Sequence, residues 1–220
     1  MFIAGTNFVL SYYIAKGKFK KAAQDEEFKT YLFGIIALTL VTTFFIYFFA
    51  DVSETPTETQ LIAHPMVNGE LESAFRHALF QVLSVITTTG FVTADFTIWT
   101  PFLTSMFFVM MFAGACAGST AGGVKIVRHI IMIKNGFLEF KRTIHPNAII
   151  PVRYNEKPVS RGIVFNIMAF FILYLLVFVF GTLVFTLMDI DLVTSLGAAA
   201  SSLGNIGPAL GKLGPVYNYS

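Results

Sequence analysis

The sequence predicts an all-α polytopic membrane protein made of repeated helix–pore-loop–helix units. Three observations lead to this prediction. Of the 220 residues, 55% are hydrophobic and only 13% are charged, whereas soluble domains contain about 25% charged residues. Two long apolar runs contain no charged residue. Each run is followed by a shorter apolar segment that ends in a glycine-containing turn.

The two long runs, 31–50 and 163–188, are predicted to be outer helices that cross the bilayer. The first contains 20 residues, which corresponds to about 30 Å of helix and matches the hydrocarbon core of a membrane. The second contains 26 residues, which allows tilt or protrusion. Residues 1–15 are also apolar, and we interpret them as the tail of a helix.

Basic residues set the predicted orientation in the membrane. Lys and Arg are concentrated in 16–29 and 125–161, whereas 51–72 contains five acidic residues and neither Lys nor Arg. Lys and Arg are enriched in cytoplasmic loops. We therefore expect connectors 16–30 and 137–160 to lie in the cytoplasm and the acidic segment to lie outside.

The predicted pore helix, 71–86, enters from the outside and cannot cross the membrane in this orientation. If it crossed, the basic residues that follow would lie outside. We therefore expect the chain to turn at a filter loop, Thr-Thr-Thr-Gly-Phe at 87–91, and to return to the outer surface. Irregular backbone at membrane depth is tolerated only when it is buried in protein or lines a water-filled cavity. Thr100 and Pro101 then begin the inner helix, as N-cap and first residue.

The inner helix is predicted to cover 101–136 and to be broken near its centre. Segment 114–123 contains four glycines, and a glycine in a helix interior costs about 1 kcal/mol relative to alanine. We expect a glycine-rich loop at membrane depth here. It belongs to a complete repeat that covers 31–136.

A second, partial copy of the repeat is predicted at 161–220. Asp191 can cap a pore helix at 192–203, and a filter loop, Gly-Asn-Ile-Gly-Pro at 204–208, follows it. Either loop alone is more typical of a turn between packed helices. Two copies in matched contexts favour pore loops, in which carbonyl oxygens replace the hydration shell of a cation.

Three motifs in this order resemble one family. They are Thr-Thr-Thr-Gly-Phe at 87–91, Gly-Ser-Thr-Ala-Gly-Gly-Val-Lys at 118–125 and Leu-Gly-Asn-Ile-Gly-Pro at 203–208. Together they look like the Trk/Ktr/HKT superfamily of potassium transporters, and most like its bacterial TrkH members. The resemblance covers essentially the whole chain. It implies four repeats around one potassium-channel-like, pseudo-fourfold pore, with two filter quarters and the last inner helix outside this sequence. It also implies that 1–15 is the tail of the inner helix of a preceding repeat.

The resemblance also implies roles for individual residues. One quarter of an ion-selectivity filter would be formed by Thr88, Thr89, Gly90 and Phe91, and another by Asn205, Ile206, Gly207 and Pro208. K+ would bind to the backbone carbonyls of Thr88, Thr89, Asn205 and Ile206. The gating loop that obstructs the pore would consist of Gly118, Ser119, Thr120, Ala121, Gly122 and Gly123. Close helix packing through the small residues is the alternative interpretation of this loop.

The function implied by the resemblance is potassium uptake across the cell inner membrane. A Na+-permeable or weakly selective cation transporter and a non-conducting membrane scaffold are the alternatives. The implied partners are membrane lipid, a second copy in a homodimer and a cytosolic nucleotide-binding TrkA-like subunit. We expect K+ only as the transported ion, with no bound cofactor and no nucleic acid. Lys125 and Arg128 lie near the end of the broken helix, either as interfacial anchors or as contacts for gating or for a partner.

Other chemistry is not predicted. No combination of nucleophile, base and orienting group is readable, so we do not expect an enzyme. Gly118 and Gly123 have the spacing of a phosphate-binding loop, but Val124 separates Gly123 from Lys125, and Ile126 stands where a Ser or Thr would follow the Lys. The four His residues are scattered, which argues against a metal site. Asp95 could concentrate cations at the pore mouth or act as a solvated cap.

Overall fold

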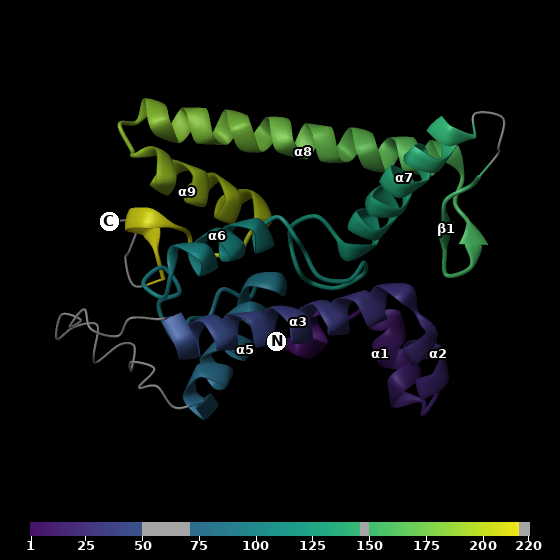
Figure 1. Ribbon diagram of the computed structural model, residues 1–220, viewed down its shortest axis with the longest axis horizontal. Coiled ribbons are helices and arrows are strands. Elements are labelled where there is room, and N and C mark those ends of the chain that lie inside the picture. Colours follow the sequence, from purple (N-terminus) through teal and green to yellow (C-terminus); the bar gives the residue numbers. More distant parts are fainter. Residues whose placement is uncertain (50–70, 146–149, 216–220) are drawn as a thin grey trace.

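The computed structural model describes residues 1–49, 71–145 and 150–215 (Figure 1). The regular secondary structure of this part of the chain is helical apart from one two-stranded hairpin, as the predicted all-α class requires. The elements are η1 Phe2–Gly5, α1 Phe8–Ala15, α2 Phe19–Gln24, α3 Glu26–Phe49, α5 Leu71–Ile86, α6 Pro101–Met110, α7 Ile126–Ile144, β1 Arg153–Tyr154, β2 Lys157–Pro158, α8 Arg161–Leu187, α9 Leu192–Gly204 and η2 Gly211–Leu213. Most of the predicted external segment, 51–72, lies outside the described residues, as do Ala50 and 216–220.

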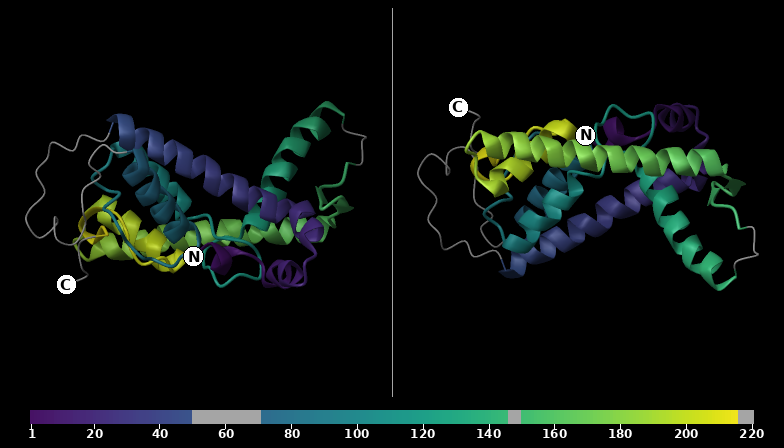
Figure 2. Two further views of the ribbon diagram at one scale, coloured as in Figure 1. Left: turned by 90° about the horizontal axis from the view of Figure 1, so that it is seen from below. Right: turned by 90° about the horizontal axis from the view of Figure 1, so that it is seen from above.

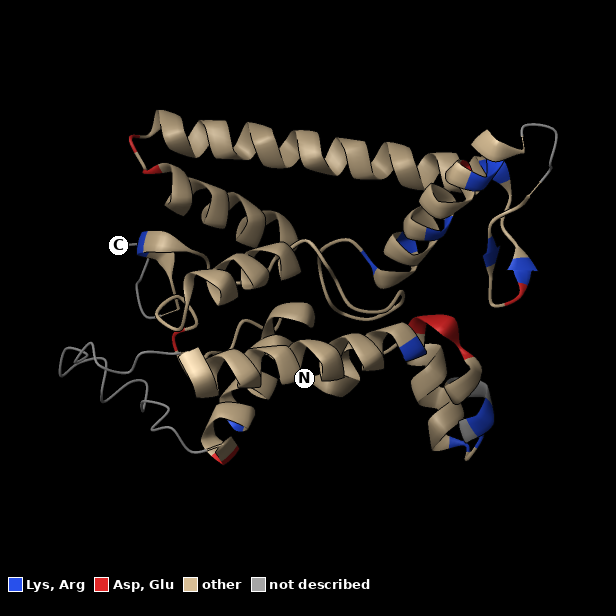
Figure 3. Cartoon of the chain, viewed as in Figure 1, with Lys and Arg blue, Asp and Glu red and all other residues tan. Residues whose placement is uncertain are grey.

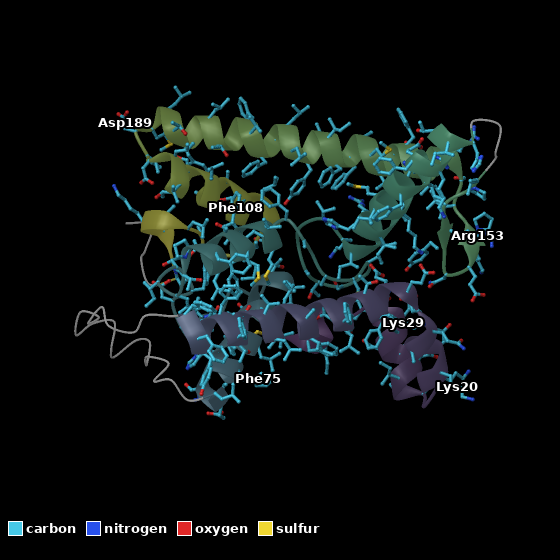
Figure 4. All side chains as sticks on the ribbon, viewed as in Figure 1. Lys20, Lys29, Phe75, Phe108, Arg153 and Asp189 are labelled. Atoms are coloured by element: carbon cyan, nitrogen blue, oxygen red, sulfur yellow. The ribbon has the colours of Figure 1, made fainter. Side chains whose placement is uncertain are left out.

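Two helices, α3 and α8, are long and apolar enough to cross a membrane. They run along the long axis of the molecule, and α6 and α9 lie between them in Figure 1. Large apolar side chains on α8 point away from the rest of the chain (Figure 4), with Phe165 71% exposed and Leu187 84% exposed. An outward apolar surface of this kind is suited to lipid or to further helices.

Lys and Arg are distributed unevenly along the long axis (Figure 3). Lys and Arg are concentrated at the end formed by α2, α7 and the hairpin, where Lys20, Lys29 and Arg153 lie in Figure 4. Asp189 lies at the opposite end, where α8 turns into α9. The two predicted basic connectors thus lie at the same end of the molecule.

The short helices α5, α6 and α9 all begin at the end that carries Asp189 and stop near the middle of the long axis (Figures 1 and 2). After α5 the chain returns to that end, and α6 begins at Pro101. The side chain of Thr100 caps α6 by accepting a hydrogen bond from the Leu103 N–H at 3.2 Å. The chain therefore turns back after α5, which extends only part of the way along the long axis (Figure 1).

Aromatic packing fixes the segment that returns from α5 to α6. Phe96 stacks on Phe107 with ring centroids 4.8 Å apart, and Trp99 meets Phe107 edge to face. All three side chains are buried, and aromatic pairs of this geometry contribute about 0.5–1.5 kcal/mol beyond the area that they bury. This cluster gives the irregular segment a fixed position against the inner helix.

The inner helix departs from its predicted limits. α6 ends at Met110, so the helix is interrupted over 111–125, a longer break than the glycine-rich segment suggested. The Gly114 N–H donates to the Val124 carbonyl at 2.8 Å. Backbone groups in this region thus pair across the break and not along a helix, which ends the apolar helical run early.

The second half of the inner helix, α7, continues to Ile144, beyond the predicted end at residue 136. Arg142 holds its last turns by hydrogen bonds to the Asn135 side chain at 3.2 Å and to the Ile150 carbonyl at 2.7 Å, and by an ion pair with Glu139. These polar contacts explain why a charged sequence remains helical. The predicted connector 137–160 therefore begins inside a helix and contains the hairpin, in which Tyr154 is paired with Lys157.

Candidate functional site

The first predicted filter loop follows the C-terminal end of α5. Thr88 has a left-handed backbone, with φ 51°, and the Thr89 N–H donates to the Ser84 carbonyl at 3.0 Å. The Ser84 hydroxyl donates to the Phe91 carbonyl at 2.6 Å. Farther back on α5, Gln81 donates to the Ala94 carbonyl at 2.7 Å. The loop is thus held against the helix that precedes it, in the manner of a left-handed helix cap.

The second predicted filter loop follows the C-terminal end of α9 in the same way. Asn205 has φ 53°, and the Ile206 N–H donates to the Ser201 carbonyl at 3.0 Å. The Ser201 hydroxyl donates to the Gly207 carbonyl at 3.0 Å and accepts from the Gly207 N–H at 3.1 Å. The two loops therefore share a backbone pattern in which Thr88 corresponds to Asn205 and Gly90 to Gly207.

The N-terminal end of α9 is capped by Asp191. Its carboxylate accepts hydrogen bonds from the Thr194 N–H at 3.1 Å and from the Thr194 hydroxyl at 2.9 Å. These hydrogen bonds lower the pKa of the Asp191 carboxyl. A negative charge at this end of a helix is favourable because the unpaired N–H groups carry partial positive charge.

The two loops meet at Gly90. A methyl group on Gly90 would lie 2.2 Å from the Ile206 carbonyl oxygen, and one on Gly207 would lie 3.6 Å from the Gly90 Cα. Both glycines have positive φ, 70° and 115° respectively. Only a residue without a Cβ meets both requirements at Gly90, which are a left-handed backbone and direct contact with the other loop.

The predicted gating loop connects α6 and α7 and is closed on itself by backbone pairing. Ala113 and Val124 form an isolated parallel bridge. Gly118 and Gly123 have φ of 69° and 65°, and the Cys116 N–H donates to the Gly5 carbonyl at 3.0 Å. The loop is therefore an ordered structure that also contacts the N-terminal segment.

The gating loop touches both filter loops through Gly122. The Gly122 N–H donates to the Thr88 hydroxyl at 2.8 Å. A methyl group on Gly122 would lie 2.2 Å from the Gly204 carbonyl oxygen, which belongs to the last residue of α9. The structure thus brings all three predicted segments together at one place, midway along the long axis.

The two basic residues after the gating loop have different surroundings. The Lys125 ammonium donates to the Ser119 carbonyl at 3.3 Å and also to the Ala121 carbonyl. It therefore links two carbonyl groups within the loop. Arg128 instead lies over the ring of Phe170 on α8, 3.7 Å from its centroid. Of the pair, only Lys125 contacts the gating loop in the structure.

Asp95 does not lie open at a pore mouth. It is buried, and its Oδ1 accepts hydrogen bonds from the Thr97 N–H at 2.9 Å and from the Thr97 hydroxyl at 2.6 Å. Its geometry is that of a local turn. Among the described residues, no group of three or more His, Cys, Asp or Glu side chains is placed to hold a metal ion.

Sequence reasoning missed the two serines that support the filter loops, Ser84 and Ser201. Each lies six or seven residues before the carbonyl to which it donates. Aligning the two predicted pore helices on their glycines would have placed these serines at matching positions. Sequence reasoning also missed Glu27, whose buried carboxylate accepts hydrogen bonds from N–H groups on both sides of the gating loop. No local sequence pattern pointed to this residue.

The family model for cation transport proteins named TrkH matches residues 1–218. This chain belongs to the TrkH family. The crystal structure of the potassium transporter TrkH from Vibrio parahaemolyticus superposes with a TM-score of 0.80 at 32% identity, covering 96% of this chain and 42% of that one. This match confirms the predicted fold class, and the three predicted motifs fall within the TrkH match.

Curated relatives of this TrkH chain are named Trk system potassium uptake proteins. The TrkH of Salmonella typhimurium is 29% identical over 192 residues, which cover 87% of this chain and 36% of the relative. The TrkH of Halomonas elongata is 43% identical over 109 residues, covering 50% of this chain and 23% of the relative. The chain thus spans well under two thirds of the length of these relatives.

Proposed function

We propose that this chain supplies two neighbouring quarters of a K+ filter in a potassium uptake protein of the cell inner membrane. The observation that carries the proposal is the contact between two equivalent loops at Gly90 and the Ile206 carbonyl. Each loop follows a short helix that stops midway along the molecule. The relatives that are named potassium uptake proteins support K+ as the ion.

In this proposal, the C-terminal ends of the two pore helices help to bind the cation. The C-terminal ends of α5 and α9 carry partial negative charge, which favours a cation beside them. Backbone carbonyls of Thr88, Thr89, Asn205 and Ile206 would replace the hydration shell of K+. Ser84 and Ser201 hold the loops in the backbone conformation that this requires.

We further propose that 118–123 is the gate. The loop lies against both filter loops through Gly122, and Lys125 fastens it through the carbonyls of Ser119 and Ala121. Ions that leave the filter would meet this loop before they reach the basic end of the molecule. Opening then requires that these few hydrogen bonds break, which is compatible with a small conformational change.

Ion flux measures the filter and the gate separately. The full-length protein in lipid vesicles should pass K+ in preference to Na+. Deleting Ser119 to Gly122 should raise K+ flux in protein that inserts normally. Equal K+ and Na+ flux would favour the weakly selective alternative, and no flux of either ion, even in the deletion variant, would favour the scaffold.

Assembly is part of the same proposal. We expect a homodimer in lipid and a cytosolic nucleotide-binding TrkA-like subunit at the basic end, where α7 and the hairpin lie (Figure 3). Copurification of the full-length protein with such a subunit, lost when Lys141 and Lys157 are both replaced by Glu, would support this arrangement. Copurification that survives both substitutions would count against it.

A further inference from the structure

Glu27, in the first turn of α3, is a buried carboxylate that contacts the gating loop on both sides. Its side chain is only 2% exposed. The Oε1 atom accepts hydrogen bonds from the Ala117 N–H at 2.6 Å and from the Val127 N–H at 3.2 Å. Ala117 immediately precedes the gating loop, and Val127 lies in the first turn of α7, which follows it. One oxygen atom therefore joins the beginning and the end of the loop.

The contact with Val127 supplies a hydrogen-bond acceptor to an N–H group at the start of α7. The first N–H groups of a helix have no partner within the helix, and the N-cap of α7 is Lys125, whose side chain makes no capping hydrogen bond. Glu27 supplies an acceptor from another helix, with a negative charge that suits a helix N-terminus. Lys125 adds an electrostatic attraction to Glu27.

The backbone that carries Glu27 is fixed on the basic side of the molecule. Asp25 accepts a hydrogen bond from the Phe28 N–H at 2.9 Å and caps the start of α3. Asn155, between the two strands of the hairpin, donates to Asp25 at 2.8 Å and accepts from the Glu26 N–H at 2.8 Å. Glu26 also forms an ion pair with Lys134 of α7 at 2.5 Å. Glu27 is thus held in place independently of the loop that it binds.

We infer that Glu27 is a positioning residue that holds the gating loop in its obstructing conformation. This inference rests on the gate assigned to 118–123 above. The Lys125 ammonium binds two carbonyl groups within the loop. The Glu27 carboxylate binds the N–H groups on either side of the loop and so attaches both ends to α3. Loss of the Glu27 oxygen leaves two N–H groups without this acceptor, which favours a loop that has moved away from the filter.

Hydrogen exchange of the full-length protein tests the contact itself. In Glu27→Ala, the amides of Ala117 and Val127 should exchange at least about tenfold faster than in the wild type, because a hydrogen bond to a charged group contributes at least that factor. Glu27→Gln keeps an accepting oxygen and should retain most of the protection. Glu72→Ala is the control, because its carboxylate pairs with Arg76 within α5 and makes no hydrogen bond to the loop.

Three outcomes would overturn the inference. The first is wild-type exchange at both amides in Glu27→Ala. The second is equal loss of protection in Glu27→Gln and Glu27→Ala. The third is faster exchange throughout α8 and α9, which would show general destabilisation. If Glu27→Ala does not accumulate in the membrane, Glu27→Asp gives the same test, because its shorter side chain cannot reach both N–H groups.

Potassium flux separates this inference from the proposed gate. Faster exchange in Glu27→Ala together with raised K+ flux supports both assignments. Faster exchange with wild-type flux supports the positioning role of Glu27 and counts against the loop as the gate. The deletion of Ser119 to Gly122 tests the gate without involving Glu27.

Discussion

Replacing Gly90 with alanine would place a methyl group directly against the second filter loop. The new Cβ would lie 2.2 Å from the Ile206 carbonyl oxygen, whereas ordinary contact begins at 3.4 Å, so the two loops would have to separate by about 1 Å. Alanine at φ 70° adds backbone strain. We expect Gly90→Ala to destabilise the protein by about 2–5 kcal/mol, from about 1–2 kcal/mol of strain and about 1–3 kcal/mol of overpacking.

Ion selectivity is the more specific result of this change. Displaced carbonyls would fit the ion less well, so we expect the K+ to Na+ flux ratio of the full-length protein to fall at least about tenfold, which corresponds to about 1.4 kcal/mol. The assay is flux into lipid vesicles, with thermal stability measured on the same samples.

Two glycines provide controls for Gly90→Ala. Gly17 has φ 71° but no atom within 4 Å of the added Cβ, so Gly17→Ala isolates the backbone strain. Gly34 lies in α3 with open space around it, and Gly34→Ala should stabilise by up to about 1 kcal/mol. If Gly90→Ala lost no more stability than Gly17→Ala and kept wild-type selectivity, the contact between the loops would be refuted.

Three further predictions concern neighbouring contacts. Thr88→Val keeps the branched side chain but removes the acceptor for the Gly122 N–H, so it should cost about 1–3 kcal/mol in thermal unfolding, and an unchanged melting temperature would contradict this. Lys125→Met should raise K+ flux about tenfold by freeing the loop carbonyls, with wild-type flux as the opposing result. Ser201→Ala removes the hydroxyl that binds the Gly207 backbone and should lower the K+ to Na+ flux ratio. Ser202→Ala, at an exposed position, is the control and should leave the ratio unchanged. Equal effects of the two substitutions would contradict a specific role for Ser201.

The sequence predicted the helices well where physical signals were local. The pore helix at 71–86 coincides with α5, and Asp191 caps the helix that it was expected to cap. A single carboxylate followed by an apolar run specifies such a helix start without help from the rest of the chain. The predicted turn at Gly90 likewise follows from a residue that tolerates positive φ.

Helix ends that depend on distant partners were predicted less well. The sequence suggested an apolar helix up to the glycine-rich segment 114–123, but pairing between Gly114 and Val124 ends it at Met110. It also suggested that α7 stops near residue 136, where Arg142 and its acceptors prolong it. Propensity is a weak guide at such places because tertiary hydrogen bonds of comparable energy decide the outcome.

The sequence by itself determined that this protein is helical and membrane-embedded, that its basic connectors are separated along the chain by an acidic segment without Lys or Arg, and that it carries two filter-like loops and one glycine-rich loop. Composition, charge and glycine spacing are properties of the chain alone. Only the tertiary structure decided that Gly90 touches the Ile206 carbonyl, that Gly122 binds Thr88, and that Glu27 holds both ends of the glycine-rich loop. These contacts join residues far apart in the chain, and only the packing of the helices brings them within hydrogen-bonding distance.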